Sequence, residues 1–181
     1  EHFEFAFDYK YSAGSNSGVF LHTRRGVDPP YNSGIEISIQ DNGKADSLHK
    51  HGDGSVYDIK APSVDKWTGP EKWNSMHIRM AGTRLENYHN GEKVIDLNKA
   101  SDEWKALVAA SKFTSWPLWG KDSQGQICLQ DHGGEGLSSH QADGREVGMA
   151  FHLAEQETAD DLPHADMGLQ DPTREVGADA D

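Results

Sequence analysis

The chain has 181 residues, of which 35% are hydrophobic, and a formal net charge of −13. This length is sufficient for one domain with its own core. The negative charge argues against nucleic acid or an anionic membrane as a partner, and no run of about 18 apolar residues predicts insertion into a membrane. A single cysteine, Cys128, excludes an internal disulfide and a cysteine-based zinc cluster.

The acidity is concentrated at the C-terminal end. Residues 1–135 contain 15 Lys and Arg against 19 Asp and Glu, whereas residues 136–181 contain 2 against 11. The second segment has one Phe, no Trp and no Tyr, and it lacks both strand alternation and a helical stripe. High charge with few large apolar side chains predicts disorder or loose structure. We therefore predict a folded domain over residues 1–135 and an irregular acidic tail over residues 136–181.

Short strands are predicted through most of the first segment. Residues 3–9 and 35–39 place large apolar side chains at every second position, which is typical of half-buried strands. Asn90-Gly91 is a strong signal for the turn of a hairpin. In chain order, the predicted strands cover residues 3–11, 18–24, 34–41, 55–59, 73–82, 83–97 (which include the hairpin) and 125–133.

One helix is predicted, over residues 101–113, with Ser101 as its N-cap and Glu103 in its first turn. Many short strands at even spacing, little helix and 19 glycines predict an all-β sandwich or jelly roll. Within it, Trp73 is expected in the core, and His77 and His89 are expected at the surface.

Five motifs then follow one another in a specific order: GSNSGVFL, YNSGIEISIQDN, DGSVYDIKAP, EKWNSMHIRMAGTRLENYHNGEKVIDL and GQICLQDHGGE. With these motifs the chain resembles the 3-keto-disaccharide hydrolase domain family over roughly residues 1–135. The resemblance implies a concanavalin A-like jelly-roll sandwich of two antiparallel sheets. It also implies a bacterial, periplasmic or extracellular protein, although the chain shows no signal peptide.

The chain departs from the family pattern at both ends. The family domain has strands upstream of the one that opens this chain, so N-terminal strands are expected to be missing. After the last motif the family has a closing strand of the type V-x-F-R-N-I, where this chain has GLSSHQADGRE. We hypothesise that a single-nucleotide frame shift after about Glu135 replaced this strand with the acidic tail. Resequencing of the gene tests this, because an unbroken frame that keeps the tail in independent clones contradicts it.

Glu36 is the first candidate for a catalytic residue. It lies in the middle of a strand between two isoleucines, on the polar face together with Ser38 and Gln40. A carboxylate on a partly buried sheet face has a perturbed pKa and is suited to acid–base catalysis or metal binding. The alternative is an ordinary solvated strand residue. The resemblance favours a role for Glu36, whose position matches the acidic residue of the family's strand, and Gln40 is a candidate for substrate binding.

Further candidate site residues lie at the ends of two predicted strands. Asp41 is a second catalytic candidate, or it caps the turn at residues 41–43. Gln130, Asp131 and His132 lie where a strand leaves the sheet, next to two glycines. His132 is suited to acid–base chemistry or, with other oxygen ligands, to binding a divalent cation. Gln130 and Asp131 are candidates for substrate binding, and the alternative is a structural turn in which Asp131 binds backbone amides.

The remaining candidates for sugar binding are a pair of residues in the second predicted strand and three tryptophans. The resemblance implies an arginine near residues 22–25 that binds sugar hydroxyls or a carboxylate, and His22 or Arg24 is expected to fill this role. Asn16 and Ser17 are expected to shape the turn before them. Trp67, Trp116 and Trp119 lie in predicted loops, and one of them is expected to stack on a sugar ring; the alternative is that they anchor the loops.

The reaction that the resemblance implies needs few groups. A ketone at C3 of a glycoside acidifies the proton on C2, so that a base can remove it and the glycosidic oxygen leaves from C1; water then adds. Glu36, Asp41 and His132 are the expected catalytic set, with a divalent metal ion as an optional cofactor and a saccharide as the partner. The alternatives are a non-catalytic glycan-binding module on the same fold and a truncated domain without activity.

Overall fold

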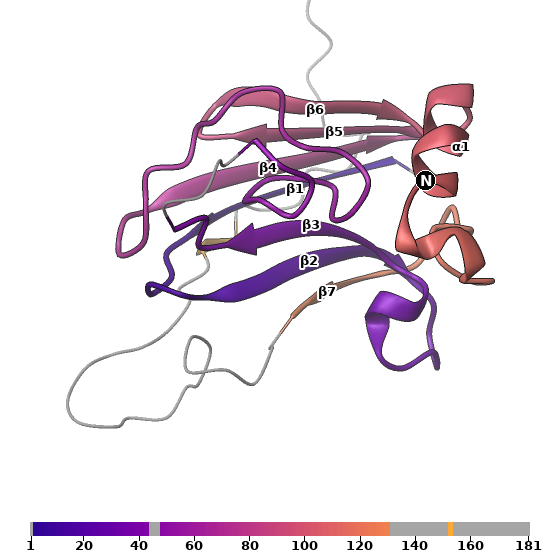
Figure 1. Ribbon diagram of the computed structural model, residues 1–181. Coiled ribbons are helices and arrows are strands. Elements are labelled where there is room, and N and C mark those ends of the chain that lie inside the picture. The colour runs from indigo at the N-terminus through magenta and orange to yellow at the C-terminus, as the bar shows by residue number, and fades with distance from the viewer. Residues whose placement is uncertain (1, 44–47, 131–151, 154–181) are drawn as a thin grey trace, which may run out of the picture.

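The computed structural model describes residues 2–43, 48–130 and 152–153 (Figure 1). In chain order its elements are β1 (His2–Tyr9), β2 (Asn16–Thr23), the 3₁₀ turn η1 (Pro30–Asn32), β3 (Ile35–Gln40), β4 (Asn74–Ala81), β5 (Arg84–His89), β6 (Glu92–Asn98), α1 (Asp102–Ala109), the 3₁₀ turn η2 (Lys112–Ser115), β7 (Gln126–Leu129) and β8 (His152–Leu153). None of the described helices is long and apolar enough to cross a membrane.

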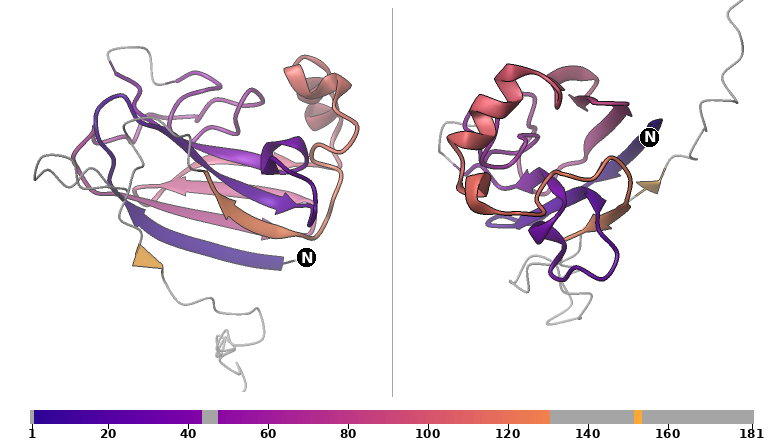
Figure 2. Two further views of the ribbon diagram at one scale, coloured as in Figure 1. Left: turned by 90° about the horizontal axis from the view of Figure 1, so that it is seen from below. Right: turned by 90° about the vertical axis from the view of Figure 1, so that its right-hand side faces the viewer.

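The strands form two antiparallel sheets that pack face to face (Figures 1 and 2). The larger sheet has the order β6-β5-β4-β1-β8, and the smaller has the order β3-β2-β7. The helix α1 follows β6 and lies beside one end of the sandwich (Figure 1). The prediction of an all-β sandwich with two antiparallel sheets and one short helix is therefore confirmed.

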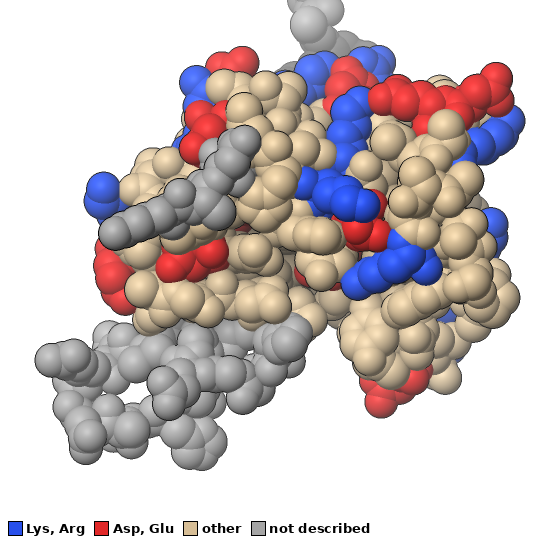
Figure 3. Space-filling model, viewed as in Figure 1, with Lys and Arg blue, Asp and Glu red and all other residues tan. Residues whose placement is uncertain are grey.

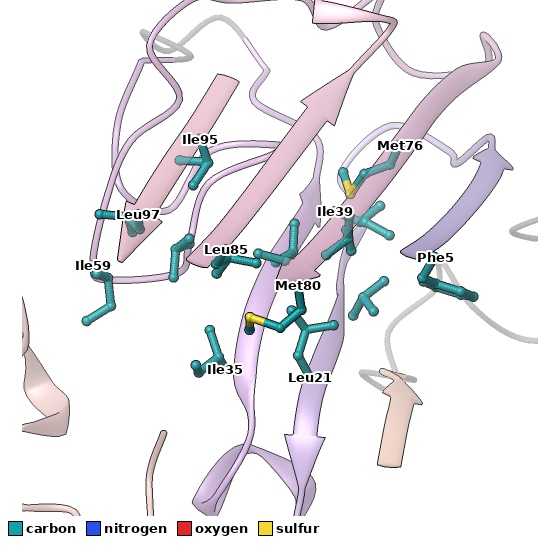
Figure 4. Packing of buried hydrophobic residues seen from close by; sticks show 14 of the residues in the cluster. Phe5, Leu21, Ile35, Ile39, Ile59, Met76, Met80, Leu85, Ile95 and Leu97 are labelled. Carbon is teal, nitrogen blue, oxygen red and sulfur yellow. The ribbon is translucent and has the colours of Figure 1, made fainter. Parts of the chain in front are cut away.

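The core lies between the two sheets and follows the alternation in the sequence. Every second residue of β1 from Phe5 to Tyr9 is buried, as are the three isoleucines of β3. Leu21 and Ile35 meet Met80 and Leu85 of the facing sheet (Figure 4). Burial of large apolar side chains stabilises the fold by roughly 1.5–3 kcal/mol for each residue. The core thus fixes which face of β2 and β3 points outward.

The segment after β3 returns alongside that strand. Its backbone bonds to β3 at three points, with Ser38 N–H donating to the Ser55 carbonyl at 3.0 Å, Gly54 N–H to Ser38 at 2.9 Å and Tyr57 N–H to Glu36 at 3.0 Å. A strand was predicted at residues 55–59, but the structure has only isolated bridges there, at Val56. The segment places Tyr57 next to Glu36 at the edge of the small sheet.

The predicted helix is shorter than the sequence indicated. Ser101 caps it as expected, because its side chain accepts a hydrogen bond from Trp104 N–H, but α1 ends at Ala109. A second cap follows at once, since the side chain of Ser111 accepts from Phe113 N–H and begins η2. This break turns the chain so that Lys112 and the aromatic residues after it approach the small sheet.

The expectations for Trp73 and His89 are wrong, and the expectation for the tail concerns mostly residues that the structure does not describe. Trp73 is 53% exposed and is covered on one face by Lys10, whereas it was expected in the core. His89 was expected at the surface but is 1% exposed, because it lies on the inner face of β5. The predicted tail lies outside the described residues apart from β8, which pairs with Phe7 and Asp8 of β1.

Candidate functional site

A pocket of about 170 Å³ lies on the outer face of the small sheet, between that face and the turn η2. Figure 3 shows this side of the molecule, where lysine and arginine side chains border a hollow that contains acidic atoms. The sheet, the segment after β3, both 3₁₀ turns and the end of β7 all contribute. The residues that line the pocket are Asn16, Phe20, Tyr31, Glu36, Tyr57, Lys112, Phe113, Trp116, Trp119 and Gln130.

Glu36 forms the floor of the pocket. It pairs with Phe20 across β2 and β3, and both side chains point away from the core. Gly18 lies beside it, and a Cβ atom there would stand only 2.7 Å from the Cγ and Oε1 atoms of Glu36. The carboxylate can therefore lie flat across the strand only because residue 18 has no side chain. Glu36 is 9% exposed, so a charged ligand group would meet it largely without water.

Burial raises the pKa of Glu36 to about 7, and the positive charge of Lys112 opposes this increase. A carboxyl group with a pKa near neutrality is divided between its acid and base forms at physiological pH. Such a group can accept a proton from a substrate and return it within one reaction cycle. This is the property expected of a general base rather than of a structural ion pair.

Beside Glu36, the wall of the pocket is formed by Lys112, whose ammonium group packs on two aromatic rings. The Lys112 ammonium lies 4.3 Å from the ring centroid of Tyr57 and 5.1 Å from that of Phe113. Such contacts hold a cation electrostatically against the ring faces. The phenol of Tyr57 has a raised pKa, because of burial first and of the nearby Glu36 second, and it therefore keeps its proton.

The wall continues from Phe113 with further aromatic side chains. Phe113 and Trp119 are stacked with ring centroids 4.0 Å apart, and Trp116 stands edge-on to Phe113 at 5.3 Å. Tyr31 of η1 is 43% exposed at the mouth, 6.0 Å from Trp116. Phe113 and Trp119 are buried against each other, so Trp116 and Tyr31 provide the ring surface that a ligand can reach. Exposed aromatic faces can bind the C–H faces of sugar rings through apolar contact while leaving the hydroxyl groups free. The arrangement suits a ligand with one flat apolar face.

Two amide side chains complete the polar part of the lining. Asn16 begins β2, and Gln130 follows β7 with its backbone N–H donating to the Gly18 carbonyl at 2.9 Å. The Oε1 atom of Gln130 is buried without a hydrogen-bond partner among the described residues. A buried acceptor without a partner costs about 1–3 kcal/mol. A hydroxyl group of a ligand in the pocket would supply the missing donor.

The structure brings two of the predicted site residues into this pocket, Glu36 and Gln130. Asp41 instead accepts hydrogen bonds from the backbone N–H groups of Gly14 at 2.6 Å and Gly43 at 2.8 Å, which is the turn-capping alternative. Gln40 is not part of the lining, and its backbone N–H bonds to Asp53. Asp131 and His132 lie outside the described residues.

The two residues expected to contact sugar after the first turn also lie outside the lining. His22 has a positive φ of 55° next to a register shift between β2 and β7, and its ring lies edge-on to Phe3. The shift breaks the alternation of β2 and directs His22 away from the pocket. Arg24 is exposed and forms a two-pronged ion pair with Asp122, with distances of 2.9 and 2.6 Å.

Some lining residues are marked by strand alternation, whereas others come from segments without a local pattern. Phe20 pairs directly with Glu36, and Asn16 lies four residues before Phe20 on the same outward face of β2. Strand alternation alone would have found them. By contrast, Tyr57 and Lys112 come from irregular segments 55 residues apart, whose meeting depends on the tertiary fold. Of the three tryptophans considered, Trp116 and Trp119 line the pocket.

Over residues 2–43, 48–130 and 152–153, no group of three His, Cys, Asp or Glu side chains is placed to hold a metal ion. His49 and His51 are neighbours, with ring centroids 6.3 Å apart, but the Nε2 atom of His51 lies 2.9 Å from Asp58 Oδ1. A divalent cation as cofactor stays a prediction.

Comparisons with known proteins concern the family and the fold of the chain. A family model described as a 3-keto-alpha-glucoside-1,2-lyase-like domain matches residues 1–141. A curated 3-keto-disaccharide hydrolase of Bacteroides thetaiotaomicron is 28% identical over 159 residues, which cover 74% of this chain and 54% of that protein. The chain therefore spans about half the length of this curated relative.

Solved structures show the same fold. A protein of Parabacteroides distasonis, provisionally described as a glycosyl hydrolase, has 26% identity and a TM-score of 0.65, covering 72% of this chain and 65% of that one. A second structure from the same organism, with the same description, has 18% identity and a TM-score of 0.50 over 74% of this chain and 58% of that one, and it supports the fold alone.

Proposed function

The chain belongs to the family of 3-keto-alpha-glucoside-1,2-lyase-like domains, and from this premise we propose that it cleaves the glycosidic bond of 3-keto-glycosides. The observation that supports the proposal best is Glu36, a buried carboxylate with a pKa near 7 on the floor of a pocket with aromatic walls. The curated relative is named for such a substrate, and the P. distasonis protein is described as a glycosyl hydrolase.

The proposed reaction begins with Glu36 as the base. The ketone at C3 withdraws electrons from the C2–H bond, and the Glu36 carboxylate removes that proton to leave an enolate. The enolate collapses to a double bond between C1 and C2 and expels the glycosidic oxygen from C1. Protonation of that oxygen releases the free alcohol, and water then adds across the double bond to give the 3-keto-sugar. The proton held by Glu36 is available for the leaving oxygen.

This route differs from that of ordinary glycosidases. Those enzymes place two carboxylates on opposite sides of the bond, about 5–10 Å apart. Among the described lining residues, Glu36 is the only carboxylate. A single base is sufficient for elimination, because the ketone of the substrate supplies the activation that a second carboxylate would otherwise provide.

The bound sugar is expected to lie with its apolar face against the aromatic wall and its hydroxyls toward the amides. Stacking on Trp116 and the neighbouring rings fixes the plane of the ring above Glu36. Hydrogen bonds to Asn16 and to the unpartnered Oε1 atom of Gln130 then set its rotation within that plane. These contacts hold C2–H toward the carboxylate.

The test is release of the alcohol from a 3-keto-glucoside by the chain and by the variant Glu36→Gln. We expect turnover by the wild type, with kcat/KM rising as the pH passes through about 7, since Glu36 must lose its proton to act. The variant should lose activity by about 10²–10⁴-fold. Glu92→Gln, a matched change of an exposed carboxylate on β6, should behave as the wild type.

Two results would contradict the proposal. If Glu36→Gln retains full turnover, Glu36 is not the base. If the wild type has no turnover while the sugar raises its melting temperature, the domain is a glycan-binding module instead. A parallel assay with EDTA tests whether a divalent cation takes part, because its removal should abolish turnover only if a metal is required.

A further inference from the structure

Lys112 is the cation of the pocket lining as far as the structure describes it. It begins the turn η2, directly after the Ser111 cap, and its ammonium rests on the ring faces of Tyr57 and Phe113. The charged and titratable groups that line the pocket beside it are Glu36, Tyr31 and Tyr57. Glu36 feels its charge directly. The pocket therefore holds one buried carboxylate and one cation around the same space.

The backbone of Lys112 is held by a polar cluster of Asp58, Lys50 and His51 outside the pocket lining. Its backbone N–H donates to Asp58 Oδ2 at 2.8 Å. The other oxygen of Asp58 lies 2.7 Å from the Lys50 ammonium and 2.9 Å from His51 Nε2. Burial raises the pKa of Asp58, but these hydrogen bonds outweigh that effect and hold it at about 2, so Asp58 is charged at neutral pH. The start of η2 is thus tied to the segment that carries Tyr57.

Removal of a proton beside a ketone places negative charge on the ketone oxygen. Glu36 cannot stabilise that charge, because it is itself the acceptor of the proton. The amides of Asn16 and Gln130 can donate hydrogen bonds but carry no charge. Preorganised positive charge aimed at the oxygen where charge develops is a large contribution to catalysis in a site with little water.

We propose that Lys112 is the catalytic cation that stabilises the enolate oxygen formed when Glu36 removes the C2 proton. The inference rests on the proposed function and names the group that accepts the developing charge. Lys112 lines the pocket with its ammonium on two aromatic faces, so that it stands beside the space above Glu36. In the described part of the chain, no salt bridge of Lys112 is found that would compete with a ligand.

The test compares Lys112→Met and Lys112→Arg with the wild type in steady-state cleavage of a 3-keto-glucoside, over a range of pH. Lys105→Met, an equivalent change on the exposed face of α1, is the control. We expect Lys112→Met to lower kcat by about 10–10³-fold with little change in KM, because the interaction exists only in the transition state. Lys112→Arg should recover part of this loss.

The pH profile gives a second readout that a merely structural role would not change. Without the cation, Glu36 loses the interaction that lowers its pKa, so the pH at which kcat/KM rises should move upward in Lys112→Met. It should stay in place in Lys105→Met and Lys112→Arg.

Three outcomes overturn the inference. If Lys112→Met raises KM and leaves kcat unchanged, Lys112 binds an anionic group of the substrate in the ground state. If kcat and the pH profile are both unchanged, Lys112 has no role in the reaction. If the wild type has no turnover, the proposed function fails and the inference fails with it. The first two results leave the proposed function intact, so the two failures are distinguishable.

Discussion

At the scale of single residues, the site depends on the relation between Gly18 and Glu36. The two strands pair so that Gly18 faces Ser38 and Phe20 faces Glu36, which leaves an open space on the sheet beside the carboxylate. Glu36 occupies that space, where a Cβ atom on residue 18 would overlap its Cγ and Oε1 atoms at 2.7 Å. Gly18 of the first motif is therefore explained by packing against the carboxylate rather than by a turn.

The variant Gly18→Ala should displace the carboxylate without unfolding the domain. The backbone at Gly18 does not require a positive φ, so alanine is tolerated there, and the flexible Glu36 side chain moves instead. Misplacement of a base by about 1 Å reduces kcat by about 10²-fold. Measurement of kcat and of the melting temperature checks this.

Gly34→Ala is the matched control for this change. A Cβ atom there would stand 2.6 Å from Thr23 Cγ2 and 3.1 Å from Phe20 Cβ, which is a comparable overlap that does not involve the Glu36 side chain. It should lower the melting temperature while kcat changes little. If Gly18→Ala keeps full activity, the position of Glu36 is not set by this glycine.

At the scale of elements, the sequence predicts the strands that carry the floor of the pocket but not the turn that closes it. Alternation over β1 and β3 and the Asn90-Gly91 turn between β5 and β6 are local signals, and the structure has all three. Alternation also places Glu36 on the outward face. The register shift near His22 breaks the same rule, which is why its prediction fails there.

The walls of the pocket depend on contacts between distant segments. Asp58 and Lys112 are 54 positions apart, and no local pattern of the sequence links them. Asp41 shows a second reason why a site residue cannot be predicted from the sequence alone. An Asp before Asn-Gly has both a catalytic and a turn-capping interpretation, and only the hydrogen bonds to Gly14 and Gly43 distinguish them.

The contact between Asp58 and Lys112 joins the segment after β3 to the turn η2, and a variant of Asp58 tests it. Asp58 has a positive φ of 58°, which Asn tolerates. Asp58→Asn keeps the backbone but replaces one of the two accepting oxygens by an NH₂ group, so that either the Lys112 N–H or the Lys50 and His51 pair loses its acceptor. We expect a loss of about 1–3 kcal/mol in the free energy of unfolding, together with a lower kcat.

Ser101→Ala is the control for this variant. It removes the N-cap of α1, which is in the same part of the chain, and costs about 1 kcal/mol. It leaves the Asp58 contact in place, so kcat should be retained. If both variants lower kcat equally under conditions where they are folded, the effect comes from general loss of stability rather than from the position of Lys112.

At the scale of the whole molecule, a buried polar network joins the segment after β3 to the large sheet. The Tyr9 hydroxyl lies 2.6 Å from Asp53 Oδ2 and 2.9 Å from His89 Nε2. Asp53 is also bound by the Gln40 N–H, and Asn87 Nδ2 donates to the Gly54 carbonyl at 2.9 Å. Through these contacts the core of the sandwich supports the segment that carries Tyr57 and Asp58 to the pocket.

The shifted pKa values of Asp53 and His89 in this network affect how the free energy of unfolding depends on pH. Burial raises the pKa of Asp53 to about 7 and lowers the pKa of His89 to about 4. Between pH 4 and 6.5 the unfolded chain carries a proton on His89 and none on Asp53, whereas the folded pair keeps one proton in the network. The two residues therefore bind the same number of protons in both states, and their effects on the pH dependence of stability cancel in this range.

The variant Asp53→Asn should remove this cancellation. An asparagine fits the site, because its oxygen can accept from the Gln40 N–H and its NH₂ group can donate to the Tyr9 oxygen, while the Tyr9 hydroxyl donates to His89. His89 then acts alone: the unfolded state binds one proton more than the folded state between pH 4 and 6.5. The free energy of unfolding of the variant, relative to the wild type, should rise with pH by up to about 1.4 kcal/mol per pH unit.

Urea denaturation at pH 4.5, 5.5 and 6.5 measures this difference, with Asp8→Asn, an exposed carboxylate on β1, as the control. The raised pKa of Glu36 contributes equally to both proteins and does not enter the comparison. Parallel curves for Asp53→Asn and the wild type would mean that Asp53 and His89 do not share a proton in the folded state. Divergent curves would mean that Asp53 and His89 together keep one proton in the folded state from pH 4.5 to 6.5, so that the core beneath the loop carrying Tyr57 keeps the same protonation over this range.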